Sequence, residues 1–370
     1  MLIPLVDLKA QHQQIADELQ QRFERLFENT EFILGEEVAS FEHEFAGFCG
    51  VKHCVGVANG TDALEMMLRA FGVANGDEVI VPANSFIATA AAVVRAGAVP
   101  RFADSDPETH LVDVQTVAQQ INRRTKAIVP VHLYGQIAPM EELKALAGQT
   151  GVLLLEDAAH AQGARHHKQG IGSIGLAAAT SFYPSKNLGG YGDGGAVLTN
   201  SDDVAAAVRA LRNHGSETKY HHPRVGFNSR LDAIQAVVLS AKLKHLAHWN
   251  EARRQAARRY DELLSELDAV TLPVTLPGNE HVWHLYVVRV PRRDAVLRKL
   301  NEAGIGAAPH YPLPIHLQGA FKHLCHKRGD FPVAEGASEQ VLSIPIFPEI
   351  TVEQQIYVVS ELQRALSKVG

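Results

Sequence analysis

The chain has 370 residues, of which 46% are hydrophobic and 21% are charged, and its formal net charge is −6 at pH 7. This composition is typical of a globular protein with room for two domains, and the mixed charges exclude the basic field of a nucleic-acid or membrane-surface protein. The three cysteines lack metal-ligand spacing, the histidines form no ligand array, and no apolar run is long enough to cross a membrane. We therefore expect a cytoplasmic protein with a small-molecule partner, without nucleic acid, membrane or metal.

Helical periodicity opens the chain over residues 9–29 and 36–48. Short apolar runs then alternate with helical segments. Strands are expected at 54–58, 78–81, 99–103, 126–131, 152–155, around Thr180 and at 196–199, with helices at 62–71, 87–96, 114–121, 140–147 and 204–211. Strands that are apolar on both faces and separated by helices predict a mostly parallel sheet of about seven strands, flanked by helices.

The remaining third of the chain has a different organisation. Helical patterns at 229–248 and 251–267 are followed by a Pro-rich stretch at 271–278, a strand at 282–290 and a helix at 294–303. The sequence thus predicts an α/β protein with a large cofactor-binding domain, residues 1–248, and a smaller α+β C-terminal domain, residues 249–370.

A single lysine, Lys186, lies between the apolar run 176–180 and a glycine-rich stretch that ends at Gly195. A buried strand that delivers a lysine to an interior cleft disfavours its ammonium form, which suits Schiff-base chemistry. The stretch Gly190–Gly195 also matches the G-x-G-x-x-G pattern of nicotinamide dinucleotide sites. That pattern requires a following helix, whereas 196–199 reads as a strand, so we reject a dehydrogenase.

Phosphate-binding residues are expected where the first strand turns into a helix, at Gly60 and Thr61 in the segment Asn-Gly-Thr-Asp. The first amides of a helix can hold a phosphate, although Thr61 or Asp62 could equally serve as an N-cap. Ser181, near the end of another strand, is a second candidate for the same phosphate.

Asp157 follows the buried strand 152–155 and could either cap the next helix or hold a protonated ring nitrogen. Pyridoxal phosphate (PLP) needs such a carboxylate to keep its ring charged. His160 and Gln162 could then reach the ring hydroxyl or the ring face. Phe86, at the start of a helix, could lie against the ring or be an ordinary core residue.

Together these motifs resemble the nucleotide-sugar aminotransferases of the DegT/StrS type, which are fold-type I PLP enzymes. The resemblance runs from residues 4–8 through 59–64, 156–160, 181–189 and 228–232 to His310-Tyr311-Pro. It implies that Lys186 binds PLP as a Schiff base, that Asp157 pairs with the ring nitrogen, and that Gly60, Thr61 and Ser181 hold the phosphate. It also implies a homodimer in which Asn228 reaches the phosphate of the other subunit.

The resemblance further implies contacts with a nucleotide-linked keto sugar. Tyr183, His310 and Tyr311 match positions near the sugar, and Lys219, Tyr220 and Arg230 match positions that the partner subunit contributes. The expected activity moves an amino group, from L-glutamate as in the family, to C-3 of a thymidine-diphosphate (dTDP) 3-keto-6-deoxyhexose.

Several alternatives stay open at this point. Glutamine is frequent at the position of His160 in the C-3 branch, and histidine occurs there in branches that aminate C-4. A third possibility is a non-catalytic binding or regulatory protein, which the presence of Lys186 and Asp157 disfavours. The 3-dehydratase branch has histidine in place of this lysine.

Overall fold

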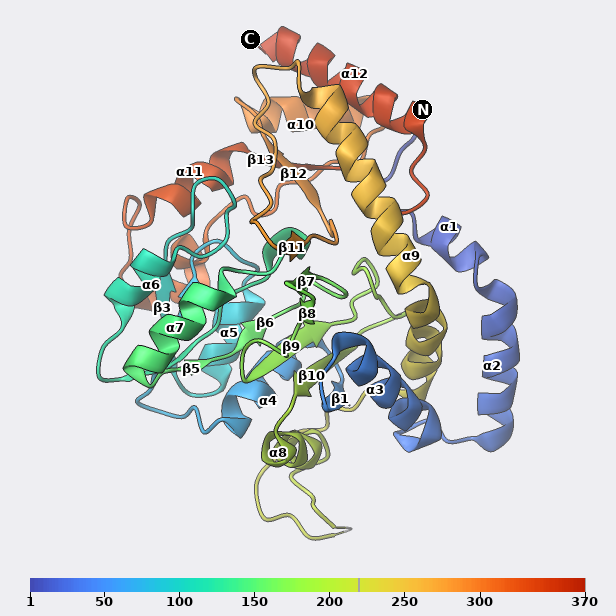
Figure 1. The fold of residues 1–370 in the computed structure, drawn as a ribbon, viewed down its shortest axis with the longest axis vertical. Helices are drawn as coiled ribbons and strands as arrows, with labels where there is room; N and C mark the ends of the chain where they lie inside the picture. Colours follow the sequence, from blue (N-terminus) through green and yellow to red (C-terminus); the bar gives the residue numbers. More distant parts are fainter. Residues whose placement is uncertain (219, 370) are drawn as a thin grey trace.

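The computed structural model describes residues 1–218 and 220–369 as a central sheet enclosed by helices (Figure 1). Its α-helices are α1 Leu8–Gln13, α2 Ala16–Asn29, α3 Gly35–Cys49, α4 Gly60–Ala70, α5 Ala88–Arg95, α6 Val114–Gln120, α7 Met140–Thr150, α8 Asp202–Arg212, α9 Ala233–Leu264, α10 Arg293–Glu302, α11 Pro332–Gln340 and α12 Val352–Val369. Short 3₁₀ turns lie at Leu133–Gly135, Ile315–Leu317 and Gly319–Leu324.

The strands are β1 His53–Val57, β2 Glu78–Pro82, β3 Val99–Ala103, β4 Thr125–Ile128, β5 Leu153–Leu154, β6 Glu156–Asp157, β7 Arg165–His166, β8 Gln169–Gly170, β9 Ala177–Ser181, β10 Gly195–Thr199, β11 Asn279–Glu280, β12 Tyr286–Arg289 and β13 Val341–Ile344. Eight of these strands build the central sheet in two groups, with the strand orders β3-β2-β4-β5 and β1-β10-β9-β6. A parallel bridge between Val131 and Asp157 joins the two halves, since β5 and β6 are separated only by Leu155.

This sheet is parallel except for β10, which runs antiparallel to both β1 and β9. The predicted α/β fold with a mostly parallel sheet is therefore confirmed. Because residues 195–199 form a strand and not a helix, the rejection of the dinucleotide-binding pattern is confirmed as well.

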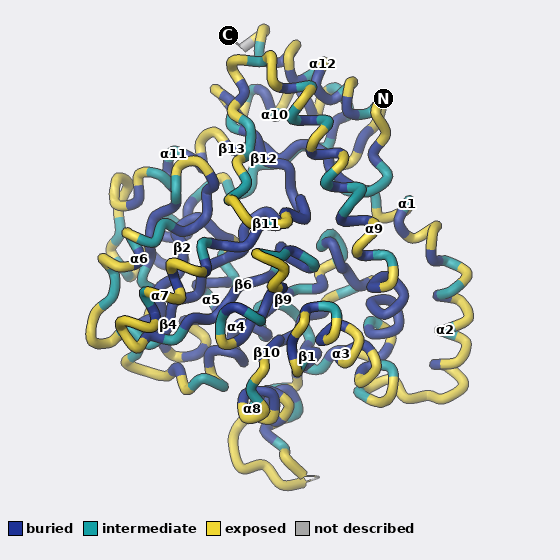
Figure 2. The backbone as a smooth tube through the Cα atoms, viewed as in Figure 1, coloured by how far each residue is buried: buried dark blue, intermediate teal, exposed yellow. Residues whose placement is uncertain are grey.

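Two hydrophobic cores lie on opposite faces of the sheet. One core packs the sheet against α2, α3, α7 and α9, and the other packs it against α4, α5 and α8. Side chains alternate between them along each strand, so Cys54 belongs to the first core and Val55 to the second. Figure 2 shows buried residues gathered along the central strands, while much of α2 and of the loop beyond α8 is exposed.

Part of the C-terminal third packs on the far half of α9, and the segment with Ile315, Phe321 and Phe331 joins the core beside α4 and α5. Tyr260 and Leu264 share a third core with β12, β13, α10 and α12, and Ile3 from the N-terminus joins it. In Figure 1 both chain ends lie beside α12 at this end of the molecule. No helix in the described part of the chain is both long and apolar enough to cross a membrane.

Two helix predictions need correction. The helices expected at 229–248 and 251–267 are one continuous helix, α9, because Trp249 and Asn250 at the expected break are buried and bonded to other elements. The helix expected at 9–29 is divided at Gln14, which receives a hydrogen bond from the Trp249 indole. The division into domains 1–248 and 249–370 stays a prediction.

Candidate active site

A narrow cradle lies where β1 turns into α4. A Cβ atom added to Gly60 would lie 2.6 Å from Ser181 Cβ, and one added to Gly195 would lie 2.5 Å from the carbonyl carbon of Asn59. The helix is capped by Asn59, whose side chain accepts the Asp62 amide at 2.8 Å, and not by Thr61 or Asp62. The first amides of a helix have no partner within it, so this cradle suits a phosphate beside the Ser181 hydroxyl.

Asp157 lies at the carboxyl end of β6 and is buried. Thr89 Oγ1 donates to Asp157 Oδ2 at 2.8 Å, and the Ala159 amide donates to Oδ1 at 3.1 Å. Burial raises the pKa of Asp157, while these two hydrogen bonds and the charge of Lys186 act in the opposite direction. The carboxylate is thus held in place at the sheet edge to which β9 delivers Ser181.

Lys186 follows β9 and is partly buried. Burial lowers the pKa of its ammonium from 10.5 to about 8, against the opposing charge of Asp157. Its neighbour Asn187 is fixed by two donated hydrogen bonds of 2.8 Å, to Asn250 Oδ1 and to the Val282 carbonyl. The lysine therefore has a readily deprotonated amine and a rigid backbone, both of which a nucleophilic lysine requires.

His160 lies beside this pair and is neutral. Its Nδ1 accepts the Tyr134 amide at 3.3 Å, so its Nε2 carries the proton and faces the Tyr311 hydroxyl at 3.4 Å. Burial, together with the charge of Lys186, holds the pKa of His160 well below its usual range. A neutral imidazole in this position can donate to an oxygen of a ligand.

Aromatic and histidine side chains of the C-terminal third complete the same region. Tyr311 lies 5.9 Å from the Phe86 ring, measured between centroids, and Phe86 is 55% exposed, so it is not an ordinary core residue. His310 Nδ1 and Ser343 Oγ share a hydrogen bond of 2.8 Å. Burial lowers the pKa of His310 to about 4. Tyr183 is also exposed, at 56%.

Asn228 and Arg230 follow the loop after α8, and Asn228 pairs with Asn213 at the end of α8 in an antiparallel bridge. In Figure 1 this loop projects beyond α8. Arg230 donates to Asn228 Oδ1 at 2.7 Å and to Asn213 Oδ1 at 3.1 Å. Ser229 donates to Asp62 at 2.8 Å, which fixes this segment beside the start of α4. Tyr220 is 82% exposed in the same loop, and Lys219 lies outside the described residues.

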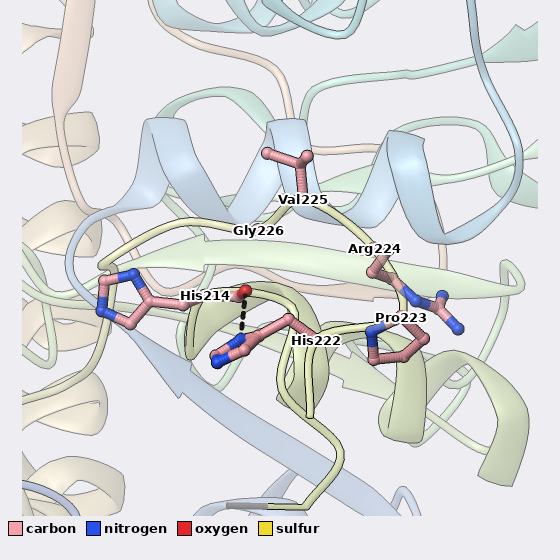
Figure 3. A pocket seen from close by; sticks show the side chains of 6 residues that line it. All are labelled: His214, His222, Pro223, Arg224, Val225 and Gly226. Carbon is pink, nitrogen blue, oxygen red and sulfur yellow. Dashed lines mark hydrogen bonds between the residues drawn. The ribbon is translucent and has the colours of Figure 1, made fainter. Parts of the chain in front are cut away.

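A pocket of about 590 Å³ opens within this loop and is separate from the residues around Lys186. Figure 3 shows its lining, in which the His222 ring donates to the His214 carbonyl at 3.0 Å. The lining residues are His214, His222, Pro223, Arg224, Val225 and Gly226. Among the residues that the structure describes, none that lines this pocket was assigned to the site by the sequence analysis.

Four residues of the site were missed from the sequence. Thr89 could have been found, because it lies one helical turn after Phe86 near the end of β2. Tyr134, Asn187 and His284 have no local signal. His284 lies 4.5 Å from the His160 ring and bonds Asn187 Oδ1 at 3.3 Å, although almost 100 residues separate it from Lys186 in sequence.

Comparison with known proteins decides the family. The DegT/DnrJ/EryC1/StrS aminotransferase family matches residues 13–363. The chain belongs to this family. The members of this family are PLP-dependent sugar aminotransferases, so this chain is an enzyme of that type and its cofactor is PLP. The glycine cradle and the buried Asp157 fit that cofactor, since it carries one phosphate and one ring nitrogen.

Similar proteins carry several names. A "Pleiotropic regulatory protein" of Geobacillus stearothermophilus is 45% identical over 98% of both chains. A "UDP-N-acetyl-3-dehydro-alpha-D-glucosamine 3-aminotranferase" of Acidithiobacillus ferrooxidans is also 45% identical over 98% of both. A "dTDP-3-amino-3,4,6-trideoxy-alpha-D-glucose transaminase" of Streptomyces venezuelae is 42% identical over 99% of this chain and 97% of its own.

A solved structure shares the fold closely. The crystal structure of S. venezuelae DesV in complex with a ketimine intermediate has a TM-score of 0.96 and 42% identity, over 98% of both chains. The predicted resemblance to this type of aminotransferase is confirmed.

Proposed function

We propose that this aminotransferase moves an amino group from L-glutamate to C-3 of a dTDP-linked 3-keto-6-deoxyhexose. The observation that carries the catalytic part is the pairing of Lys186, whose pKa is lowered to about 8, with the buried carboxylate of Asp157. A lysine with an accessible amine form and a fixed carboxylate across a ligand ring are the two groups that PLP-dependent amino transfer requires.

Lys186 is the proton carrier in this proposal. Bound PLP supplies a charged ring that accepts electrons from the carbon losing its proton. Lys186 Nζ, once it is a free amine, would take the proton from the α carbon of the amino donor and would then deliver that proton to the cofactor. Asp157 keeps the ring nitrogen protonated, and the same residues then act in the reverse direction on the keto sugar.

The other residues hold and orient the ligands. Gly60, Thr61 and Ser181 hold the phosphate, and Phe86 lies against the ring with neutral His160 at its hydroxyl side. Tyr183, His310 and Tyr311 contact the sugar. The exposed surfaces of Phe86 and Tyr183 support this assignment, because exposed aromatic side chains are available for stacking on a ligand.

We further propose that two subunits share each site. Asn228 of one subunit would reach the phosphate held by the other, and Lys219, Tyr220 and Arg230 would reach its sugar and diphosphate, for which positive charges are suited. Asn228 is exposed, and Arg230, which donates a hydrogen bond to it, is partly exposed, so both are accessible to a second subunit.

Mixed dimers test the sharing. Lys186→Ala and Arg230→Ala proteins are each expected to be inactive or weak, and a mixture refolded together should regain activity, because one site of each mixed dimer has both residues intact. A mixture no more active than its components would show that each subunit supplies its own Arg230.

The relatives named for 3-amino and 3-dehydro sugars support amination at C-3, and they include both dTDP and UDP substrates. His160 supports the alternative, amination at C-4 of a 4-keto sugar, by its resemblance to that branch. The regulatory name of the Geobacillus protein supports a non-catalytic role, which would require no turnover despite Lys186 and Asp157.

One spectroscopic experiment separates these functions. We expect the protein with PLP to show a near-visible absorption band that glutamate bleaches and that a dTDP-3-keto-6-deoxyhexose restores. Restoration only by the 4-keto sugar would replace C-3 with C-4, restoration only by a UDP sugar would replace the nucleotide, and no bleaching by glutamate would exclude this amino donor. Lys186→Ala should lose the band, whereas Lys144→Ala, at an exposed lysine of α7, should retain it.

A further inference from the structure

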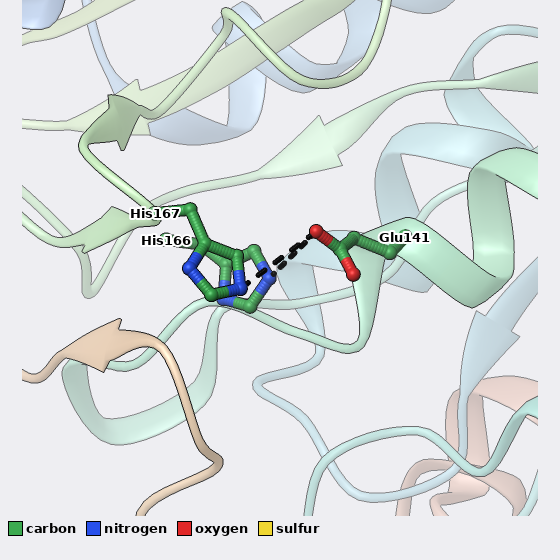
Figure 4. Close-up of side chains that lie close together, drawn as sticks. All are labelled: Glu141, His166 and His167. Atoms are coloured by element: carbon green, nitrogen blue, oxygen red, sulfur yellow. Dashed lines mark ion pairs between the residues drawn. The ribbon is translucent and has the colours of Figure 1, made fainter.

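Two histidines and one glutamate, remote in sequence, meet on the surface of the molecule (Figure 4). Glu141 lies in the first turn of α7, His166 ends β7, and His167 follows it. The Glu141 Oε1 atom is 3.5 Å from His166 Nε2 and 3.8 Å from His167 Nε2. All three potential ligand atoms lie within 4.8 Å of one another. None of these residues belongs to the site around Lys186.

The spacing of these atoms matches a metal site. Bonds of about 2.0–2.2 Å to imidazole nitrogen and carboxylate oxygen place tetrahedral ligands about 3.4 Å apart. Glu141 and His167 have side chains that are 66% and 61% exposed, so they can close the small remaining difference. Their exposure also leaves the fourth position open to water.

The second ring nitrogen of His166 is held by a fixed acceptor. Asn279 donates from its amide nitrogen to the Ile137 carbonyl at 2.8 Å, so its Oδ1 is the acceptor for His166 Nδ1 at 2.9 Å. His166 Nδ1 therefore donates to Asn279, and Nε2, which lies on the side of Glu141, is the nitrogen available to a metal. A hydrogen bond from the second ring nitrogen to a fixed acceptor is how proteins orient a metal-binding histidine.

The backbone presents both rings together. His167 and Lys168 both have positive φ, of 46° and 70°, in the two-residue turn between β7 and β8. The His167 amide donates to the Gly278 carbonyl at 3.0 Å, and a Cβ on Gly278 would lie 2.6 Å from His167 Cε1 and 3.1 Å from His166 Cε1. A side chain at residue 278 would displace the two rings from these positions.

We propose that Glu141, His166 and His167 form a three-ligand site for a first-row divalent cation, best matched by Zn²⁺. Two imidazoles and one carboxylate suit Zn²⁺ and its neighbours in the first row, whereas Mg²⁺ prefers oxygen ligands in an octahedral arrangement. A bound cation would link α7 to the β7–β8 hairpin. This differs from the sequence analysis, which expected no metal because the histidines form no ligand array in the sequence.

The test is a calorimetric titration of the PLP-loaded protein with Zn²⁺ in a buffer without phosphate or imidazole. A Cys325→Ser background removes the exposed thiol as a competing ligand. We expect one Zn²⁺ per chain in addition to any that a matched titration of free PLP explains, and no Mg²⁺ binding. Glu141→Gln and His167→Asn should each weaken Zn²⁺ binding at least ~10-fold.

Glu142→Gln is the matched control, because Glu142 is the next residue of α7 and is also exposed. Asparagine tolerates the left-handed backbone at residue 167, and circular dichroism should confirm that each variant is folded. Unchanged Zn²⁺ affinity in Glu141→Gln and His167→Asn, an equal loss in Glu142→Gln, or no Zn²⁺ binding by the parent protein would each overturn the proposal. All of these readouts are independent of aminotransferase activity.

Discussion

Gly60→Ala is the substitution that tests the phosphate cradle most directly. The added methyl carbon would lie 2.6 Å from Ser181 Cβ, 3.1 Å from its Oγ and 3.2 Å from its Cα, so either β9 or the start of α4 must move. Overpacking of this kind costs about 1–3 kcal/mol, whereas alanine in place of glycine inside a helix contributes about 1 kcal/mol. We therefore expect the free energy of unfolding of the cofactor-free protein to fall by about 0–2 kcal/mol.

Cofactor binding should suffer more than folding. The displaced Ser181 and the displaced amides of α4 are the groups that we assign to the phosphate, so a distortion worth about 1–3 kcal/mol on binding raises the dissociation constant of PLP by about 5–150-fold. The dissociation constant is measured by titrating the cofactor-free protein with PLP and following the near-visible band. Urea denaturation of the same sample gives the free energy of unfolding.

Gly47→Ala is the matched control, because Gly47 lies in helix α3 and an added Cβ there meets nothing within 4 Å. It should stabilise the protein by about 0.5–1 kcal/mol and leave PLP affinity unchanged. If Gly60→Ala binds PLP as tightly as the parent protein does, the close approach of Gly60 and Ser181 is not the phosphate site.

Three further perturbations test the groups around the cofactor and in the core. Thr89→Val removes the donor to Asp157, so the pKa of that carboxyl should rise further and the acidic limb of the kcat profile should move to higher pH, while Thr89→Ser should restore it. Glu42→Gln leaves Arg212 buried without its ion-pair partner, and urea denaturation should show a loss of about 3–5 kcal/mol; a loss below ~1 kcal/mol would contradict this. Lys186→Met should be more stable than the cofactor-free parent below pH 8. That advantage should shrink between pH 8 and 10.5, because there the unfolded lysine keeps a proton that the folded one has lost; an advantage independent of pH would refute the lowered pKa.

The sheet and its helices could be predicted because their signals are local. The strand expected at 54–58 corresponds to β1, and the strand expected at 196–199 corresponds to β10, since apolar runs with turn residues at both ends do not depend on distant contacts. Lys186 and Asp157 were proposed for the same reason, because each follows such a run a few residues later in the sequence.

The break expected inside α9 shows where local signals fail. A polar Asn250 beside His248 and Trp249 indicates the end of a helix, but in the structure the Asn250 amide donates to the Gln162 carbonyl and its oxygen accepts from Asn187. These partners lie 63 or more residues away from Asn250, so the short stretch of sequence used to predict a helix does not contain them. Buried polar groups with complete partners can continue a helix that composition alone would end.

The same contacts explain why the site depends on both of the predicted domains. Asn187, next to Lys186, is bonded to Asn250 of α9 and to the Val282 carbonyl, and its oxygen is bonded to His284. Residues 250–284 thus fix the backbone that carries Lys186, although they follow residue 248, where the large domain was predicted to end. The groups that make the lysine rigid therefore come from the part of the chain that the sequence analysis assigned to the smaller domain, and the geometry of the site depends on the packing of that part against the sheet.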